Sequence, residues 1–186
     1  MTLIQPEILS LVQHINVLHV APQTYRPDSC PGCQHAVVWN HGCYTRQPGC
    51  SDLTEQSLSP VLILRFYCPS CHSTCSVLPE CIPPRSWYLS RVRQAILLHL
   101  LAGNSIRSAV TCKTENSNPT KPACNTIKRW WNRFKDSFAL YSSSLCAMFP
   151  CLGRYAGFKE FWKVLFALRP LSSAMRLLHD EGIYIP

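Results

Sequence analysis

Two short cysteine motifs carry the clearest chemistry in this chain of 186 residues. Cys30-Pro31-Gly32-Cys33 and Cys68-Pro69-Ser70-Cys71 share the pattern C-P-x-C, and 34 residues separate them. Two residues between cysteines allow a tight turn to present both sulfurs to one ion, and zinc takes four such ligands in a tetrahedron. Because four thiolates leave no open position, the pattern predicts a closed, structural Zn²⁺ site made by Cys30, Cys33, Cys68 and Cys71.

The number of cysteines also bears on the compartment. Twelve cysteines in a small secreted chain would indicate disulfides. However, no Lys or Arg precedes Arg26, and polar residues interrupt the early apolar stretch 8–20, which is not typical of a secretory leader. We therefore expect a cytoplasmic protein with reduced thiols, some of which bind metal.

The other eight cysteines give a weaker signal. Free cysteine commonly behaves as a small buried apolar side chain, and we expect this of Cys43, Cys50, Cys75, Cys81, Cys112, Cys124, Cys146 and Cys151. The first four lie in the same region as the two motifs, so a second metal site is the alternative there. We expect the nearby histidines at the surface or in turns, with substitution for a cysteine ligand as the alternative: His35, His41 and His72.

The positive charge is concentrated in one segment. The chain has a formal net charge of +8, and residues 85–135 contain ten Lys or Arg and a single acid, Glu115. The remainder is nearly neutral, with eight basic and nine acidic residues. A generally basic surface would spread this charge, whereas a module that binds a polyanion would concentrate it.

Residues 125–135 end this basic segment and are expected to be helical. At about 100° per residue, the apolar side chains share one face: Ile127, Trp130, Trp131, Phe134 and Phe138. The basic side chains share the opposite face, as a helix that enters the DNA major groove requires. The side chains expected to contact DNA are Asn125, Thr126, Lys128, Arg129, Asn132, Arg133 and Lys135. An ordinary amphipathic helix with a solvated basic face is the alternative.

Two further helices are expected before this one, and the three together favour a helix-turn-helix. Residues 87–101 carry apolar side chains at helical spacing, with Ser86 as the expected N-cap and Arg93 outside the apolar stripe. Residues 105–110 are expected to form a short second helix. The polar segment 111–122 then separates the second and third helices by more than the three or four residues of the usual turn.

The chain as a whole is expected to have an α+β fold, with a small β zinc ribbon followed by the helix-turn-helix and by C-terminal helices. The expected boundaries are 1–24 for an apolar lead-in, 25–84 for the zinc ribbon, 85–138 for the helix-turn-helix and 139–186 for the C-terminal helical region. The lead-in fits a strand nearly as well as a helix. Within the ribbon we expect strands over 36–39, 61–67 and 76–78, a loop over 51–60 and a short linker at Pro83-Pro84.

The motifs resemble those of a known group. Residues 25–84 resemble the zinc ribbon of bacterial insertion-sequence proteins, in the segments 30–33, 40–46, 65–71 and 76–79. Residues 85–138 resemble the helix-turn-helix that follows that ribbon, in the segments 101–103 and 126–131. The resemblance implies a transposase-associated protein, or a related family of unknown function, that binds double-stranded DNA. It also implies that the four cysteines of the two motifs are the zinc ligands.

Catalysis is not expected. A transposase that cuts DNA needs a further domain in which three carboxylates hold two metal ions. The 48 residues after Phe138 are too few for that domain, and the acids near them lie in short helical segments: Asp136, Glu160, Asp180 and Glu181. We therefore expect a non-catalytic, sequence-specific DNA-binding protein, an accessory or regulatory factor of a mobile element or a remnant of one. A zinc-ribbon module that binds RNA or another protein without DNA specificity is the alternative.

The remaining expectations concern location and assembly. No apolar run approaches the roughly 18 residues of a membrane span, so we expect no membrane contact. From the DNA-binding interpretation we expect no small-molecule substrate and a place at the bacterial nucleoid. The apolar helix expected over residues 158–168 is best explained by core packing. A homodimer surface is the alternative, because helix-turn-helix proteins often pair to match two half-sites.

Overall fold

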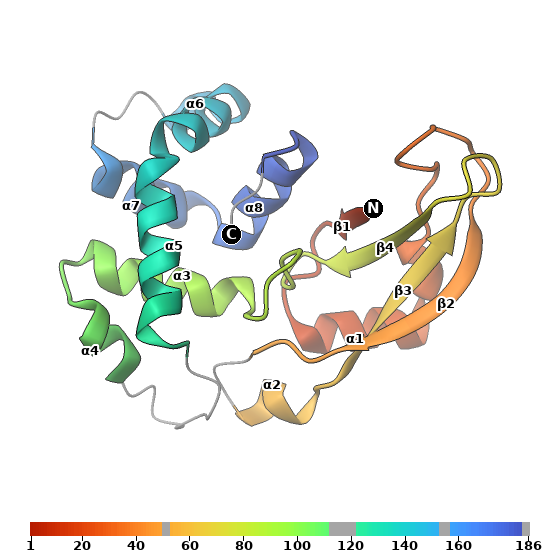
Figure 1. Ribbon diagram of the computed structural model, residues 1–186, viewed down its shortest axis with the longest axis horizontal. Helices are drawn as coiled ribbons and strands as arrows, with labels where there is room; N and C mark the ends of the chain where they lie inside the picture. The colour runs from red at the N-terminus through yellow and green to blue at the C-terminus, as the bar shows by residue number, and fades with distance from the viewer. Residues whose placement is uncertain (50–52, 112–121, 153–156, 184–186) are drawn as a thin grey trace.

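The structure, a computed structural model, describes residues 1–49, 53–111, 122–152 and 157–183, and places a sheet half beside a helical half (Figure 1). The elements of the sheet half are β1 (Thr2–Gln5), α1 (Leu11–Val20), the 3-10 helix η1 (Pro22–Tyr25), β2 (Trp39–Arg46), α2 (Leu53–Ser57), β3 (Val61–Tyr67) and β4 (Thr74–Pro79). Those of the helical half are α3 (Ser90–Leu101), α4 (Ile106–Thr111), α5 (Cys124–Asp136), α6 (Phe138–Met148), the 3-10 helix η2 (Pro150–Leu152), α7 (Phe158–Leu168) and α8 (Leu171–Asp180). The expected α+β fold is confirmed for the described residues.

The sheet is built around β3, the most apolar stretch of the region. Its strand order is β1-β4-β3-β2, in which β1 runs parallel to β4 and the other neighbours are antiparallel. Val61 and Ile63 are buried in one apolar cluster and Phe66 in another. A strand that contributes to clusters on both faces carries a nearly continuous apolar run, which explains why β3 matches its predicted bounds.

The N-terminal lead-in supplies both a strand and a helix. β1 extends the sheet by pairing with β4, more than 70 residues later in the chain. α1 then begins at a capping box. The backbone amide of Gln13 donates to Ser10 Oγ at 3.2 Å, and the backbone amide of Ser10 donates to Gln13 Oε1 at 3.1 Å. The strand and helix patterns that overlap in the sequence thus belong to consecutive segments.

Helix α3 packs in both halves of the molecule. Leu89, just before the helix, and Val92 are buried beside the sheet with Leu11 of α1. Leu97 and Leu101, two turns later, are buried in the core of the helical half. The two halves are therefore held at a fixed relative position by one rigid element.

A buried carboxylate adds a second connection between the halves. Glu80, directly after β4, accepts a hydrogen bond from Ser173 Oγ at 2.5 Å and pairs with Arg176 Nε at 3.3 Å, both on α8. It also accepts a hydrogen bond from the Glu7 amide at 3.0 Å. Only 4% of Glu80 is exposed, so the carboxylate is desolvated and its partners replace the lost water.

The core of the helical half is aromatic. Trp162 on α7 is 1% exposed, with its ring 4.8 Å from that of Phe134, 5.3 Å from that of Phe161 and 6.2 Å from that of Tyr141. Leu171, Met175 and other buried side chains of α8 complete this cluster. Phe161 and Trp162 of α7 are thus buried, and Phe158 and Phe166 are half-buried against the same cluster, as the core-packing interpretation predicts. This removes their exposure as an argument for a dimer.

Several predicted elements of the sheet half are wrong in position. The strand expected over 36–39 is β2, which begins only at Trp39 and continues past an irregularity between Asn40 and Cys43 that contains Gly42, whose φ is +81°. The loop expected over 51–60 contains α2, although residues 51–52 lie outside the described residues. The irregularity places turn residues inside a strand, so local turn signals gave the wrong boundary.

The junction between the halves also differs from the prediction. α3 begins at Ser90 with Leu89 as its N-cap, and Ser86 instead accepts a hydrogen bond from the buried Arg93 at 2.6 Å. Pro83 and Pro84 are buried rather than part of an exposed linker. The second and third predicted helices are present as α4 and α5, and Ser105 Oγ accepts from the Ser108 amide at the start of α4. Most of the polar segment 111–122 lies outside the described residues.

Within the described residues, the helices are too short or too polar to cross a bilayer.

Candidate metal centre and nucleic-acid face

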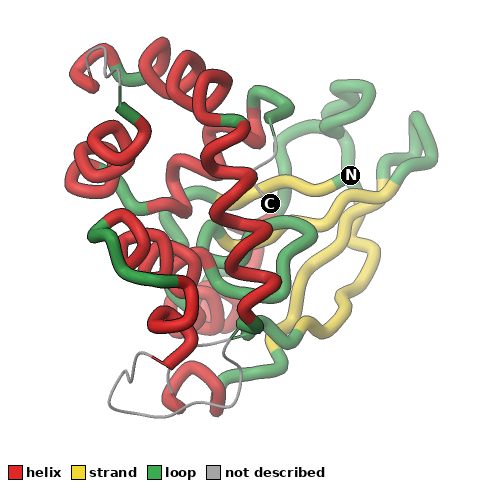
Figure 2. Tube along the Cα trace, turned by 60° about the vertical axis from the view of Figure 1, so that its left-hand side comes forward, coloured by secondary structure: helices red, strands yellow, loops and turns green. Residues whose placement is uncertain are grey.

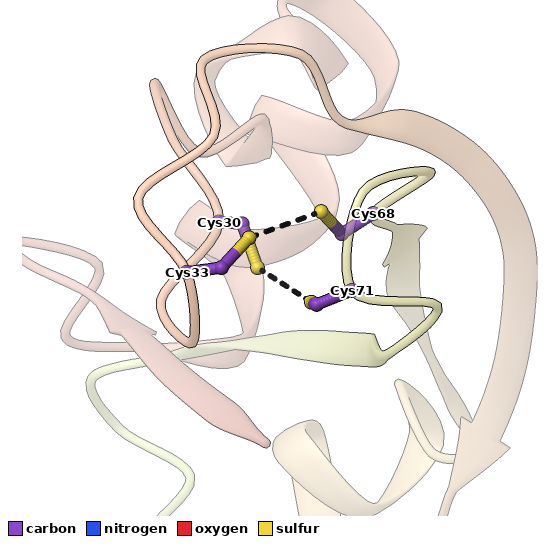
Figure 3. A group of neighbouring side chains, drawn as sticks. All are labelled: Cys30, Cys33, Cys68 and Cys71. Atoms are coloured by element: carbon purple, nitrogen blue, oxygen red, sulfur yellow. Dashed lines mark hydrogen bonds between the residues drawn. The ribbon is translucent and has the colours of Figure 1, made fainter.

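The four predicted ligand sulfurs come together in the structure (Figure 3). Cys30 Sγ lies 3.6 Å from Cys71 Sγ, and Cys33 Sγ lies 3.6 Å from Cys68 Sγ. All four sulfurs lie within 4.8 Å of one another. A zinc ion bound at about 2.3 Å to each sulfur of a tetrahedron would separate them by about 3.8 Å, whereas a disulfide needs about 2.05 Å. The spacing is compatible with a bound metal and differs from that of a disulfide.

The two motifs adopt matching backbone turns. The Cys30 amide donates to the His35 carbonyl at 2.9 Å, and the Cys68 amide donates to the Ser73 carbonyl, five residues on in the same way, at 2.9 Å. The residue after the second cysteine is left-handed in both turns, with φ of +60° at Gln34 and +56° at His72. Equivalent turns present equivalent pairs of sulfurs, which is the arrangement that a tetrahedral site needs.

The thiols of this cluster do not ionise independently. The Gly32 amide, 3.4 Å from Cys30 Sγ, and then the Cys33 amide favour the thiolate and lower the pKa of Cys30 to about 6. The His35 amide also favours the thiolate of Cys33, but burial and the neighbouring sulfurs outweigh it and raise the pKa of Cys33 to about 11. A cation at the centre would remove this conflict, because metal binding releases the remaining thiol protons.

The remaining described cysteines divide into two kinds. Cys75 and Cys81 are each 4% exposed, as predicted for small apolar side chains, and burial raises the pKa of Cys81 to about 12. Cys43, Cys124 and Cys151 are exposed, so the prediction is wrong for them. Cys146 is half-buried. Cys50 and Cys112 lie outside the described residues.

The two alternatives for metal binding find no support in the described part of the chain. There, the group of close ligand atoms consists of the four motif cysteines alone. His72 Nδ1 is engaged with Tyr67 Oη at 2.6 Å, and the His41 ring lies 5.6 Å from that of Tyr67. Both histidines therefore belong to an aromatic patch on the outside of the sheet.

Helix α5 separates its apolar and basic side chains as the sequence indicated. Ile127, Trp130 and Phe134 are buried. The exposed predicted contacts are Asn125, Lys128, Arg129, Asn132, Arg133 and Lys135, and Thr126 is half-buried. Among the described residues, none of the ion pairs involves a cation of α5. This face therefore presents positive charge to solvent.

Lys135 lies at the margin of that face. Its Nζ is 5.0 Å from the centre of the Trp131 ring, and Trp131 packs edge-on against Phe158 at the start of α7. The cation–π contact directs Lys135 toward the side of α5 that meets α7. The basic surface of α5 is thus centred on Lys128, Arg129 and Arg133.

The neighbouring helices hold α5 in place. α4 contacts both α3 and α5, and His99 Nε2 of α3 lies 2.9 Å from Ser108 Oγ of α4. Arg93 of α3 lies over the Trp130 ring, 5.0 Å from its centre. Figures 1 and 2 show α5 as a long helix running across the outside of the helical half, at the opposite end of the molecule from the β3–β4 turn that carries Cys68 and Cys71.

One feature beside α5 was missed in the sequence analysis. A cleft of about 810 Å³ is lined by the segment before α3, including Arg85 and Trp87, and by α5, including Arg129 and Arg133. These residues are more than 40 positions apart in the chain, so no local pattern links them. The sequence signal was a tryptophan two residues after an arginine, Arg85 and Trp87. Only the structure shows that 58% of the Trp87 surface is accessible.

Comparison with protein-family models, with curated proteins and with solved structures finds no match to this chain.

Proposed function

We propose that this protein is a non-catalytic, sequence-specific DNA-binding protein in which a zinc ribbon supports a helix-turn-helix. The observation that carries the proposal is the exposed basic face of α5, opposite a face that is buried by aromatic side chains. Duplex DNA is the polyanion that such a helix fits, because the major groove admits a helix and cations on it neutralise phosphates.

The three helices α3, α4 and α5 serve as the helix-turn-helix in this proposal. α5 is the recognition helix, and Asn125, Lys128 and Arg129, near its N-terminal end, lie closest to the base edges. Arginine suits guanine there and asparagine suits adenine. Arg133, one turn further along, contacts phosphate, which sets the position of the helix without reading sequence.

Zn²⁺ is held by the four sulfurs of Cys30, Cys33, Cys68 and Cys71 and has a structural role. The donor set supports this, since four thiolates occupy all the tetrahedral positions of zinc and leave none for a substrate. The cluster lies at the end of the sheet, away from α5 (Figure 1). Zinc therefore stabilises the sheet half, and DNA is bound by the helical half. We propose an accessory or regulatory factor of a mobile element as the biological setting.

The proposal is tested by duplex binding of two matched double variants. Lys128→Ala/Arg129→Ala removes two cations from α5, and Lys159→Ala/Lys163→Ala removes two exposed lysines from α7. We expect the α5 variant to bind its preferred duplex at least about tenfold more weakly, since each base contact is worth about 1–3 kcal/mol. The α7 variant should bind as the parent does. Fluorescence anisotropy on a duplex selected from a random pool measures both.

Two results would count against the proposal. Equal losses in the two double variants would show that general positive charge, not α5, binds the duplex. Equal affinity of the parent for duplex RNA and duplex DNA would favour the RNA-binding alternative, because the deep, narrow major groove of RNA does not admit a helix.

A further inference from the structure

Aromatic and basic side chains line the cleft between α5 and the segment before α3. This lining is a second surface beside the basic face of α5. Trp130 is one of its lining residues and is 7% exposed, with the Tyr88 ring edge-on at 5.4 Å and the Arg93 guanidinium 5.0 Å above its ring. The exposed Trp87 and Arg85 also line the cleft. A volume of about 810 Å³ lies within the range of about 300–1,000 Å³ that is usual for sites binding small organic groups.

Trp87 is held in position although its side chain is exposed. The Gly49 amide donates to the Trp87 carbonyl at 2.6 Å, and the Leu89 amide donates to the Gly49 carbonyl at 3.2 Å. A Cβ atom at position 49 would lie 2.7 Å from Tyr88 Cδ1 and 2.9 Å from Trp87 Cδ1, so the two rings require glycine there. The backbone bridge fixes the main chain at Trp87 before any ligand arrives, which lowers the entropic cost of binding.

The adjacent arginine is also fixed by the fold. Arg46, at the end of β2, donates hydrogen bonds to the Pro83 carbonyl at 3.1 Å and to the Ser86 carbonyl. These two carbonyls flank Arg85, which adopts a φ of +54° that is uncommon for a residue with a side chain. The clamp holds Arg85 in this conformation, and its exposed side chain lines the cleft beside Trp87.

The charge and shape of the cleft favour a strand of nucleic acid over a neutral ligand. Four arginines and one acid line it: Arg85, Arg93, Arg129, Arg133 and Asp136. A second hollow of about 650 Å³, lined by Thr45, Arg46 and Gln47, adjoins it and shares Arg85, Ser86 and Trp87 with it. Trp87 therefore lines both hollows. This arrangement fits a nucleic-acid strand that continues on both sides of one stacked base.

We propose that this cleft binds an unpaired nucleotide of the DNA, with its base stacked on Trp87 and the phosphates beside it contacted by Arg85 and Arg133. The inference rests on the proposed function, because it continues the DNA path beyond the duplex at α5. It makes the preferred ligand a duplex that carries a short single-stranded extension, or a junction of paired and unpaired DNA. Base–aromatic stacking tolerates every base, so this site adds affinity without adding sequence preference.

The test compares three DNA ligands that share one duplex, using zinc-loaded full-length protein. The first is blunt, the second carries a four-nucleotide single-stranded extension, and the third carries an abasic extension with the same phosphates. We expect the natural extension to bind about tenfold more tightly than the abasic one, the size of one base stacked on an aromatic ring. Trp87→Ala should remove this difference, and Trp87→Phe should retain most of it.

Trp39→Ala is the matched control, because Trp39 is 54% exposed, close to the 58% of Trp87, but lies on β2 outside the cleft. The combination of Trp87→Ala with the abasic extension should be no weaker than either change alone, since each removes the same contact. If millimolar free deoxynucleotide weakened binding of the extended DNA tenfold, the cleft would bind a free nucleotide, and the proposal that it binds a DNA strand would be overturned. Equal binding of the natural and abasic extensions by the parent, or equal losses from Trp87→Ala and Trp39→Ala, would overturn it as well.

Failure of this inference and failure of the proposed function give different results. If the inference alone is wrong, the blunt duplex still binds through α5 and the extension adds nothing. If α5 does not bind duplex, the blunt ligand fails, and a single-stranded oligonucleotide still reports whether Trp87→Ala weakens binding relative to Trp39→Ala.

Discussion

The sheet half and the helical half of this molecule are stabilised in different ways. In the helical half, large aromatic and aliphatic side chains form a cluster around Trp162. In the sheet half, the cluster next to the metal centre includes two of the candidate ligands themselves, Cys30 and Cys68. β2 closes the edge of that sheet with almost all of its side chains exposed. Both halves bury apolar side chains. Under the proposed zinc binding, a metal cross-link adds to that burial in the sheet half, whereas the helical half relies on apolar burial alone.

Removing the metal is the most direct test of this difference between the halves. We expect a chelator that competes for zinc to unfold the sheet half, because zinc contributes about 10–16 kcal/mol of apparent folding free energy in zinc-finger peptides. The near-ultraviolet circular dichroism of the aromatic cluster in the helical half should persist. Elemental analysis should find one zinc per chain.

Two exposed cysteines provide the control for this prediction. Cys33→Ser removes a ligand and Cys43→Ser removes a cysteine outside the cluster, and both side chains are exposed. Only the first should lose zinc and strand structure. A metal-free protein with the circular dichroism of the parent would refute the structural role of zinc.

Weakening the connection between the halves should lower the free energy of unfolding by about 2 kcal/mol, the scale of a hydrogen-bonded charged group. Glu80→Gln keeps the shape of the side chain but leaves Arg176, 24% exposed, without its buried counter-charge. We expect a lower free energy of unfolding and a loss of coincidence between transitions followed by strand and by aromatic signals in urea. Asp180→Asn removes the exposed carboxylate that pairs with the same arginine at 3.2 Å, and it should cost no more than about 0.5 kcal/mol. Equal effects of the two variants would contradict the account of Glu80.

The smallest expected effect concerns pH and lies in the sheet half. His14 is fully buried, with Nδ1 2.5 Å from Tyr25 Oη and Nε2 2.8 Å from the Leu62 carbonyl. Burial lowers the pKa of His14 below 6.5, against the opposing effect of the Leu62 carbonyl. The unfolded chain therefore takes up a proton near pH 6.5 that the folded chain does not. Stability is complete above this pH and falls as pH decreases toward the folded pKa, by at most about 1.4 kcal/mol per pH unit.

Urea denaturation at pH 7.5 and 5.5 measures this loss. His14→Gln should lose less stability between these pH values than the parent does, and His41→Gln, exposed on β2, should behave as the parent. Comparison among the variants cancels the acid sensitivity that the candidate metal-binding cysteines contribute equally to all three proteins. An identical pH response of His14→Gln and the parent would exclude a contribution of His14.

Local patterns in the sequence predicted the parts of this fold that local physics determines. The C-P-x-C spacing predicted the sulfur cluster, the apolar run predicted β3, and helical periodicity predicted α5. The failures are non-local. The parallel pairing of β1 with β4 links residues more than 70 positions apart, and the buried Arg93 donates to Ser86 and lies over the ring of Trp130, which is 37 positions later. The cleft at Trp87 depends on Gly49, which no periodicity connects to α5.

The salt dependence of duplex binding tests the central claim most directly. If α5 presents its cations to phosphates, log Kobs should fall linearly with log salt concentration, with a slope of about −0.9 for each phosphate neutralised. We predict a slope of about −3 or steeper for the zinc-loaded parent and a slope shallower by about one unit for Arg133→Ala, which removes a phosphate contact. A parent that shows no affinity for duplex DNA in dilute buffer, or a variant with an unchanged slope, would contradict the account.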